Sequence, residues 1–227
     1  MLPRSLYLTW HGLGTPPVGL TDNVCRYWHT AATFQQTLDM AHEIEAQTGA
    51  EMQFTFDDGN STDHSVGLPL LAARKRTAIF FVCAGRIGKR DFLGAAQLKE
   101  LAAAGMRIGC HGYDHLSWRE ATDATLLHEL DDGRRAIEDV LGQAVEIAST
   151  PFGALDHRSV AAAKKAGFRA LFASSGGFAT AQTGLIPRNT IGEGFAPVRD
   201  LPMMAAWSRR AHAAFYDTAR RVKYGFY

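Results

Sequence analysis

Two pairs of side chains in this sequence could together bind a metal ion and activate water. Asp57 and Asp58 are adjacent and precede Gly59, and His111 and His115 are four residues apart. Neighbouring carboxylates repel each other unless a cation or hydrogen bonds separate their roles, so a metal held by one would leave the other available as a base. Two imidazoles and one carboxylate leave coordination positions open for water or substrate, as in catalytic zinc sites. These residue types favour metal-assisted hydrolysis.

Each pair also has a plain structural interpretation. Asp58-Gly59 is a common turn sequence. Histidines at positions 111 and 115 could be surface or half-buried residues without a metal. A single helical turn over residues 111–115 would place both imidazoles on one side, and it is their combination with the carboxylate pair that favours a metal centre.

The elements that must position these residues are short apolar runs alternating with helical patterns. Strands are expected at residues 6–10, 52–56, 78–82, 106–109, 145–148, 170–173 and 185–191. Helices are expected at residues 30–47, 66–74, 95–104, 123–141, 156–166 and 203–222. This alternation predicts an α/β protein with about seven β/α units and a parallel sheet. Periodicity alone leaves both an open doubly wound sheet and a closed barrel possible.

Polar segments follow several of the expected strands. They are Trp10-His11-Gly12, Asp57-Asp58-Gly59, residues 111–115, Pro151-Phe152-Gly153 and residues 174–177. In a parallel barrel these segments meet on one rim, at the carboxyl ends of the strands where active sites are built.

Composition narrows the class of protein. The chain has 227 residues, 46% of them hydrophobic, which suits a single domain over residues 1–227. The formal net charge of +1 argues against a nucleic-acid partner. Three widely spaced cysteines fit neither a disulfide framework nor a Cys-based zinc site, and they suit a reducing compartment.

The sequence also gives expectations about location. The N-terminal residues lack the apolar run of a secretory signal. The longest apolar run, residues 78–84, is far shorter than the roughly 20 residues that span a bilayer. We expect a cytoplasmic protein without a transmembrane segment, with the inner face of the membrane as the alternative site. The oligomeric state is left open.

Two motifs carry a resemblance to a known family. Residues 55–59 read Thr-Phe-Asp-Asp-Gly, and residues 111–115 read His-Gly-Tyr-Asp-His. From about residue 52 to 173 the sequence resembles the polysaccharide deacetylase family, the carbohydrate esterases with the NodB homology domain. The second family motif is His-Ser/Thr-x-x-His, so Gly112 replaces a hydroxyl residue here.

The resemblance implies a distorted (β/α)7-type barrel and a role for each motif residue. Asp57 would be the general base, and Asp58, His111 and His115 would hold a divalent metal ion. The metal is expected to be Zn²⁺, with Co²⁺, Ni²⁺, Mn²⁺ and Fe²⁺ as alternatives. The implied reaction is hydrolysis of an N-acetyl group on an N-acetylated carbohydrate, in glycan or exopolysaccharide metabolism.

The sequence departs from the family pattern at two functional positions. Ser149 stands where the family has an arginine that orients the base, and no Leu-x-His supplies a general acid near the last strand. Arg188 is a candidate replacement for the arginine, and His11 is a candidate general acid. The alternatives are an ordinary surface arginine and a structural histidine.

These departures keep two other functions open. One is a carbohydrate-binding pseudoenzyme that retains the metal site, and the other is a deacetylase or amidase acting on a non-sugar amide.

Aromatic side chains near the predicted rim could stack on a sugar ring: Tyr113, Trp118, Phe152 and Phe178.

Overall fold

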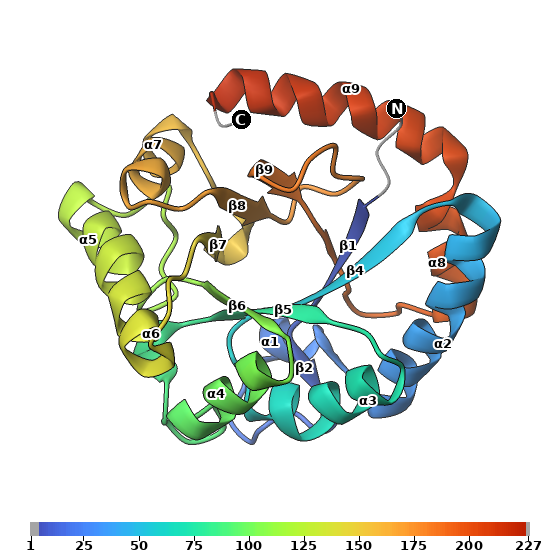
Figure 1. Ribbon diagram of the computed structural model, residues 1–227, viewed down its shortest axis with the longest axis horizontal. Helices are drawn as coiled ribbons and strands as arrows, with labels where there is room; N and C mark the ends of the chain where they lie inside the picture. The colour runs from blue at the N-terminus through green and yellow to red at the C-terminus, as the bar shows by residue number, and fades with distance from the viewer. Residues whose placement is uncertain (1–4, 226–227) are drawn as a thin grey trace.

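Eight parallel strands form the centre of the molecule. The computed structural model describes residues 5–225. Its sheet has the order β10-β1-β4-β5-β6-β7-β8-β9, and every neighbouring pair is parallel. The strands are β1 (Ser5–Trp10), β4 (Glu51–Phe56), β5 (Ala78–Val82), β6 (Arg107–Cys110), β7 (Ile147–Ser149), β8 (Ala170–Ala173), β9 (Gly184–Pro187) and β10 (Asn189–Thr190). The sheet curls into a nearly closed barrel with helices around it (Figure 1).

The two edges of the sheet are joined by one short stretch of chain. β9 pairs with β8, β10 pairs with β1, and only Arg188 separates β9 from β10. The strand expected at residues 185–191 is therefore two short strands with different partners. This split accounts for eight strands where the sequence predicts seven, and the α/β barrel itself is confirmed.

Helices cover the outer face of the sheet (Figure 1). They are α2 (Ala31–Thr48), α3 (Leu68–Ala73), α4 (Ala95–Ala103), α5 (Asp123–Leu127), α6 (Gly133–Leu141), α7 (His157–Lys165), α8 (Pro197–Ala205) and α9 (Trp207–Tyr224). α2 shows how local sequence sets the boundaries: the Thr30 hydroxyl accepts a hydrogen bond from the Thr33 amide, and Gly49 ends the helix at φ 66°. None of the helices described between residues 5 and 225 combines the length and the apolarity needed to cross a bilayer.

Two of the expected helices differ from the structure. Residues 123–141 are helical throughout, but a π-helical segment, η3 (His128–Asp132), separates α5 from α6. The single helix expected at residues 203–222 is wrong, because α8 ends at Ala205 and α9 begins at Trp207. Ala206 between them has extended backbone angles, φ −55° and ψ 140°.

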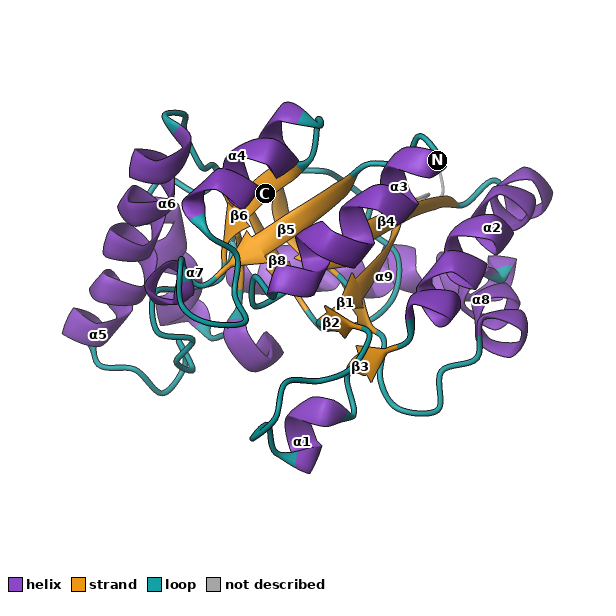
Figure 2. Cartoon of the chain, turned by 90° about the horizontal axis from the view of Figure 1, so that it is seen from below, coloured by secondary structure: helices purple, strands orange, loops and turns teal. Residues whose placement is uncertain are grey.

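A short excursion of the chain follows β1. Residues 12–29 contain β2 (Gly12–Leu13), α1 (Asp22–Cys25) and β3 (Trp28–His29), with β2 and β3 paired in a small separate sheet. Figure 2 shows this excursion extending beyond the carboxyl end of β1. The sequence patterns predicted none of these elements.

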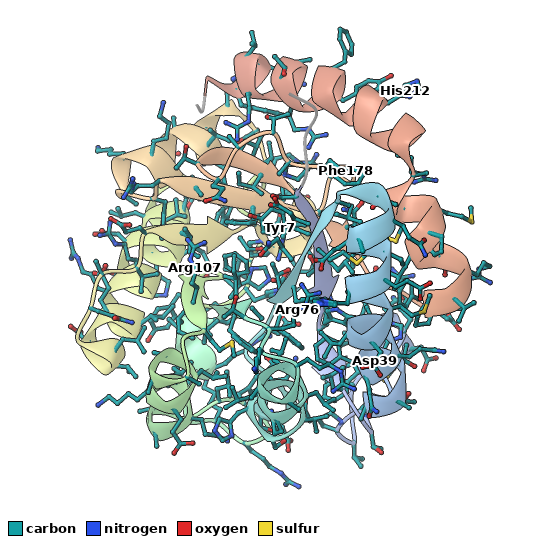
Figure 3. All side chains as sticks on the ribbon, turned by 45° about the vertical axis from the view of Figure 1, so that its right-hand side comes forward. Tyr7, Asp39, Arg76, Arg107, Phe178 and His212 are labelled. Carbon is teal, nitrogen blue, oxygen red and sulfur yellow. The ribbon has the colours of Figure 1, made fainter. Side chains whose placement is uncertain are left out.

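Successive side chains along each strand point to opposite faces of the sheet, and this alternation produces two apolar cores. Leu8, Phe34 and Phe54 belong to the core between the sheet and the helices. A smaller cluster fills the barrel: Tyr7, Ile79, Phe81, Ile147, Ala170, Phe172, Ala179 and Ile186. Figure 3 shows Tyr7 among the interior side chains. The residues that follow these apolar positions at the carboxyl ends of the strands are polar, and they form the candidate site.

Candidate active site

A cavity of about 690 Å³ lies at the carboxyl ends of the strands. Its walls come from segments that follow β1, β4, β6, β7 and β8, together with β10: His11, Asp57, Asp58, His111, His115, Thr150, Phe152, Gly153, Ser174 and Thr190. The excursion after β1 adds Val24 and Tyr27. The predicted meeting of the polar segments on one rim is confirmed.

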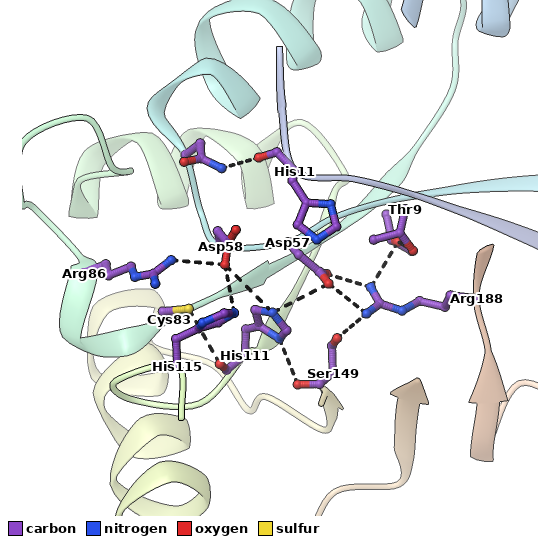
Figure 4. Close-up of polar contacts among 12 residues, drawn as sticks. Thr9, His11, Asp57, Asp58, Cys83, Arg86, His111, His115, Ser149 and Arg188 are labelled. Atoms are coloured by element: carbon purple, nitrogen blue, oxygen red, sulfur yellow. Dashed lines mark hydrogen bonds and ion pairs between the residues drawn. The ribbon is translucent and has the colours of Figure 1, made fainter. Parts of the chain in front are cut away.

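Asp57 is held by Arg188 from across the barrel (Figure 4). Nη1 of Arg188 donates to Oδ1 of Asp57 at 2.6 Å, and Nη2 donates to Oδ2 at 2.8 Å. The guanidinium also donates to Oγ1 of Thr55 at 3.2 Å and to Oγ of Ser149. Arg188 has an exposed fraction of 0%, so the alternative of an ordinary surface arginine is wrong.

Ser149 makes room for this arrangement. The family arginine would stand at position 149, and here the small serine side chain instead accepts a hydrogen bond from the guanidinium that arrives from the β9–β10 junction. The guanidinium lies over the Phe81 ring, with Cζ of Arg188 5.0 Å from the ring centroid. A two-bond arginine–carboxylate pair is strong and directional, so it fixes the orientation of Asp57.

The pair also decides the charge of Asp57. Burial alone raises the pKa of this carboxyl, but the charges of Arg188 and His111 outweigh burial and lower the pKa below its usual range. Asp57 is therefore ionised at neutral pH and can accept a proton.

The predicted metal ligands converge beside Asp57. Nε2 of His115 lies 3.1 Å from Oδ1 of Asp58, and Nε2 of His111 lies 4.0 Å from the same oxygen. The two imidazole centroids are 4.9 Å apart. Nε2 of His111 also lies 3.6 Å from Oδ2 of Asp57, so His111 stands between the two carboxylates.

The surroundings of the two imidazoles suit metal ligands. Nδ1 of His111 lies 2.9 Å from the carbonyl oxygen of Ser149, a contact that requires a proton on Nδ1 and leaves Nε2 free to face the carboxylates. Burial, reinforced by nearby His111, lowers the pKa of His115 to about 4. Burial raises the pKa of Asp58, but the charges of His115, His11 and His111 lower it by a larger amount, so the net shift of the pKa is downward. A neutral imidazole and an ionised carboxylate suit a divalent cation.

The backbone is strained at the same place. Asp58 has φ 75° and His115 has φ 64°, a region that residues other than glycine rarely adopt. Phe152, on the rim of the cavity, has φ 59°. Residues 111–115 bring the two imidazoles together without a helical turn: the segment is a loop that contains the left-handed residues Gly112 and His115.

A buried glutamate supports this histidine loop. Glu129, in η3, has an exposed fraction of 0%. Its carboxylate accepts hydrogen bonds from the Asp114 amide at 2.7 Å, the Leu116 amide at 3.2 Å and the Trp118 indole at 3.4 Å. A Cβ atom on Gly112 would overlap this carboxylate. Glu129 thus explains why glycine replaces the hydroxyl residue of the family motif.

Among the site residues that the sequence analysis did not identify, Cys83 and Arg86 follow β5. Nη1 of Arg86 donates to Oδ1 of Asp58 at 3.1 Å. Cys83 is buried, and its Sγ lies 3.6 Å from the His111 carbonyl oxygen. The signal was present, because Cys83 and Arg86 stand directly after the most apolar strand, at the same rim as the other polar segments.

Donor atoms for a metal ion are grouped closely. Among the residues the structure describes, the group of possible ligands whose donor atoms all lie within 4.8 Å of one another is Asp58, Cys83 and His115. His111 lies outside this tight group but within 4.0 Å of Asp58. Carboxylate, imidazole and thiol donors together fit a first-row divalent ion such as Zn²⁺.

His11 faces the carboxylate pair from the end of β1 (Figure 4). Its Nδ1 is buried and has no hydrogen-bond partner among the described residues. Burial lowers the pKa of His11, although the charges of Asp57 and Asp58 act in the opposite direction. The ring centroids of His11 and Tyr27 are 5.0 Å apart.

The aromatic residues suggested for sugar stacking are not equivalent. Trp118 and Phe178 are buried, and the Tyr113 ring packs against His128 with centroids 4.3 Å apart. Phe152 is 70% exposed and lines the cavity, with its centroid 4.7 Å from that of His115. Of the four, Phe152 alone lines this cavity.

Comparison with known proteins agrees with the fold and the motifs. The family model for polysaccharide deacetylase matches residues 44–171. The protein YxkH of Bacillus subtilis (strain 168), whose name assigns it to the polysaccharide deacetylases, is 28% identical over 131 residues, which cover 58% of this chain and 47% of YxkH. The chain therefore matches about half the length of that relative.

Solved structures share the architecture. The Streptococcus pyogenes deacetylase PplD, determined in complex with acetate, superposes with a TM-score of 0.77 at 19% identity over 90% of this chain and 99% of PplD. IcaB from Ammonifex degensii gives a TM-score of 0.68 at 21% identity over 91% of this chain and 97% of IcaB. The chain belongs to the polysaccharide deacetylase family.

Proposed function

We propose that this protein is a metal-dependent hydrolase that removes N-acetyl groups from an N-acetylated carbohydrate. The observation that carries the proposal is the Asp57–Arg188 pair beside Asp58, His111 and His115 in one cavity. Binding alone gives no reason to hold an ionised carboxylate next to metal-ligand side chains. The pair therefore favours an enzyme over a binding module.

Asp58, His111 and His115 would hold the metal ion. When bound there, a divalent ion supplies positive charge that polarises the acetamido carbonyl and acidifies water. Arg86, which contacts Asp58 at 3.1 Å, adds a fixed positive charge at the same carboxylate. Zn²⁺ is the ion we propose, since imidazole and carboxylate are its usual ligands at catalytic sites.

The chain's own residues then move the protons. Asp57, oriented by Arg188, accepts a proton from the attacking water. The water oxygen bonds to the acetamido carbon, the C–N bond breaks, and acetate and the sugar amine are the products. His11, which faces Asp57 and Asp58, is the proposed donor of the proton to the leaving nitrogen (Figure 4). Because burial lowers its pKa, His11 must first take up a proton, which the negative charges of Asp57 and Asp58 favour; Asp57 releases its own proton to solvent after the step.

The cavity walls supply a place for the sugar. Phe152 presents an exposed ring on one side, and Tyr27 lies beside His11 within the same cavity. The apolar face of a pyranose ring packs well on an aromatic ring. We propose that Phe152 is the stacking surface nearest the reacting acetamido group.

Acetate release from a panel of N-acetylated oligosaccharides tests the function. We expect release by the zinc-loaded protein, no release after chelation, and at least about a 100-fold loss of kcat in Asp57→Asn, which keeps the shape and removes the base. Asp139→Asn, on the exposed outer face of α6, is the matched control and should leave the rate unchanged. Bound sugar and bound metal without acetate release would instead support a carbohydrate-binding pseudoenzyme. Release from simple N-acetyl amides but from none of the sugars would support an amidase acting on a non-sugar amide.

A further inference from the structure

Cys83 is a nucleophilic side chain at the centre of the site that the proposed mechanism does not use. It follows β5 directly, and β5 lies between β4, which Asp57 and Asp58 follow, and β6, which His111 follows. Its exposed fraction is 0%. Side chains alternate along β5, with Ile79 and Phe81 inside the barrel, so Cys83 continues the inward-facing series at the rim.

The surroundings of the thiol are those of a metal-binding group. Sγ of Cys83 lies within 4.8 Å of donor atoms of both Asp58 and His115. Figure 4 shows the sulfur beside the His115 ring, on the side of the site where Asp58 lies. The thiol donates to the carbonyl oxygen of His111, with Sγ 3.6 Å from that oxygen. A thiol is a weak hydrogen-bond donor, so this contact does not prevent the sulfur from binding a metal ion.

The other two cysteines lie in different surroundings. Cys110 belongs to the core between the sheet and the helices, and its Sγ lies 4.0 Å from the Glu129 carbonyl oxygen. Cys25 is on α1, where its Sγ lies 3.8 Å from the Leu20 carbonyl oxygen. Neither belongs to the group of close donor atoms, so the two provide matched controls.

We propose that Cys83 is a direct ligand of the metal ion, through its sulfur, together with Asp58 and His115. The inference rests on the metal centre of the proposed function and adds a ligand to it. On binding, the S–H bond breaks, the proton passes to solvent, and a sulfur lone pair forms the bond to the ion, with no change of oxidation state. A thiolate ligand favours thiophilic ions such as Zn²⁺, Co²⁺ and Cd²⁺ over Mn²⁺ and Mg²⁺.

Cobalt spectroscopy tests the ligand without depending on activity. Metal-free wild type, Cys83→Ser, Cys110→Ser and Cys25→Ser are each titrated with Co²⁺, and the near-ultraviolet and visible spectra are recorded. We expect an intense thiolate-to-cobalt charge-transfer band in wild type, Cys110→Ser and Cys25→Ser. The band should be absent from Cys83→Ser, which still binds Co²⁺ and shows the weak visible bands of the ion.

Competition with other ions gives a second measurement. Loss of a residue that only hydrogen-bonds to a metal ligand typically weakens metal binding by about 10- to 100-fold. Replacing the sulfur should weaken Cd²⁺ binding by more than about 100-fold, because a direct ligand is lost. Mn²⁺ binding should change less, because oxygen suits that ion as well as sulfur does. Equal losses for both ions in Cys83→Ser would contradict the assignment.

The outcomes separate this inference from the proposed function. A wild-type cobalt complex with visible bands but no thiolate band overturns the role of Cys83 and leaves the deacetylase proposal standing. A thiolate band that depends on Cys83, in a protein that releases no acetate from any substrate, supports the ligand and overturns the deacetylase. Failure of wild type to bind Co²⁺ overturns both.

Discussion

Arg188 shows how a single buried residue can replace a motif position. Its guanidinium makes two hydrogen bonds to Asp57 while Ser149, at the family's arginine position, only accepts a hydrogen bond. The function of an arginine in orienting a carboxylate depends on where the guanidinium lies and not on the strand that supplies it.

Removing the Arg188 charge should change the pH dependence of the reaction. In Arg188→Gln the burial of Asp57 is no longer opposed by the guanidinium, so the pKa of Asp57 rises. The active, ionised form is then lost as the pH falls through the raised pKa. We expect the acid limb of the kcat/KM profile to move to higher pH and kcat to fall by at least about 100-fold. Arg188→Lys should recover part of both effects, and a profile identical to wild type would contradict the positioning role.

Asp63 is a second buried carboxyl whose protonation matters, in this case for stability. Both carboxyl oxygens are buried without a hydrogen-bond partner among the described residues, and burial, with a contribution from Asp58, raises the pKa well above its usual value. The stability that Asp63 contributes is present in full below the unfolded pKa of about 3.9 and is lost as the pH rises through the folded pKa.

Asp63→Asn should therefore raise the free energy of unfolding at neutral and alkaline pH. We expect a gain of about 1.4 kcal/mol for each unit by which the fold raises the pKa of Asp63, because the substitution removes the cost of ionising a buried carboxyl. Denaturant unfolding at several pH values measures it, with the exposed Asp139→Asn as control. A variant that is less stable than wild type at every pH would contradict this prediction, because it would show that the Asp63 carboxyl makes contacts that stabilise the folded protein.

At the scale of elements, the loop of residues 111–115 depends on the π-helical segment behind it. Gly112 has φ 83° and lies against Glu129, so Gly112→Ser, which restores the family's hydroxyl residue, should destabilise this protein. Gly105→Ser is the matched control, because Gly105 has φ 82° with open space around it. We expect about 1 to 2 kcal/mol for the control. Gly112→Ser should cost about 1 to 3 kcal/mol more, from overlap with Glu129. Equal thermal shifts for the two variants would contradict this account.

Sequence patterns predicted the elements better than the contacts between them. The strands before Asp57 and His111 are apolar runs with polar ends, and that local signal was enough to place both residues on one rim. The conformation of residues 111–115 was missed, because it depends on a left-handed Gly112 and on Glu129, which is distant in sequence. The contact of Arg188 with Asp57 spans 131 residues and follows from the register of β9 and β10, which periodicity does not specify.

The excursion at residues 12–29 and the break at Ala206 were not predicted, because neither is set by a local periodic pattern. β2 and β3 are two residues long and pair only with each other, so they carry no periodic pattern. Proline is favoured in the first turn of a helix and disfavoured in its interior, yet α8 begins at Pro197 and continues through Pro202. Contacts of α8 with α2 stabilise this arrangement, and those contacts are not local.

At the scale of the whole molecule, metal binding should stabilise the barrel. The proposed ligand residues lie in the segments that follow β4 and β6, which are far apart in sequence, so an ion that binds only the folded chain shifts the unfolding equilibrium. At free zinc about 100 times its Kd the gain is about 2.7 kcal/mol. We expect Tm to rise by several degrees with Zn²⁺ and to return after chelation, with no shift in Asp58→Asn. A shift that persists in Asp58→Asn would place the stabilising ion elsewhere.

The short stretch of chain that joins the two edges of the sheet has a consequence for biosynthesis. The stretch from residue 184 to 190 joins both edges of the sheet and carries the arginine that orients Asp57. A nascent chain that has emerged only as far as β8 contains Asp57, Asp58 and both histidines, yet its carboxylate has no guanidinium to hold it. On the proposed function, we expect activity to appear late in synthesis, with β9 and β10, and a chain that ends before these strands to be inactive although every motif residue is present.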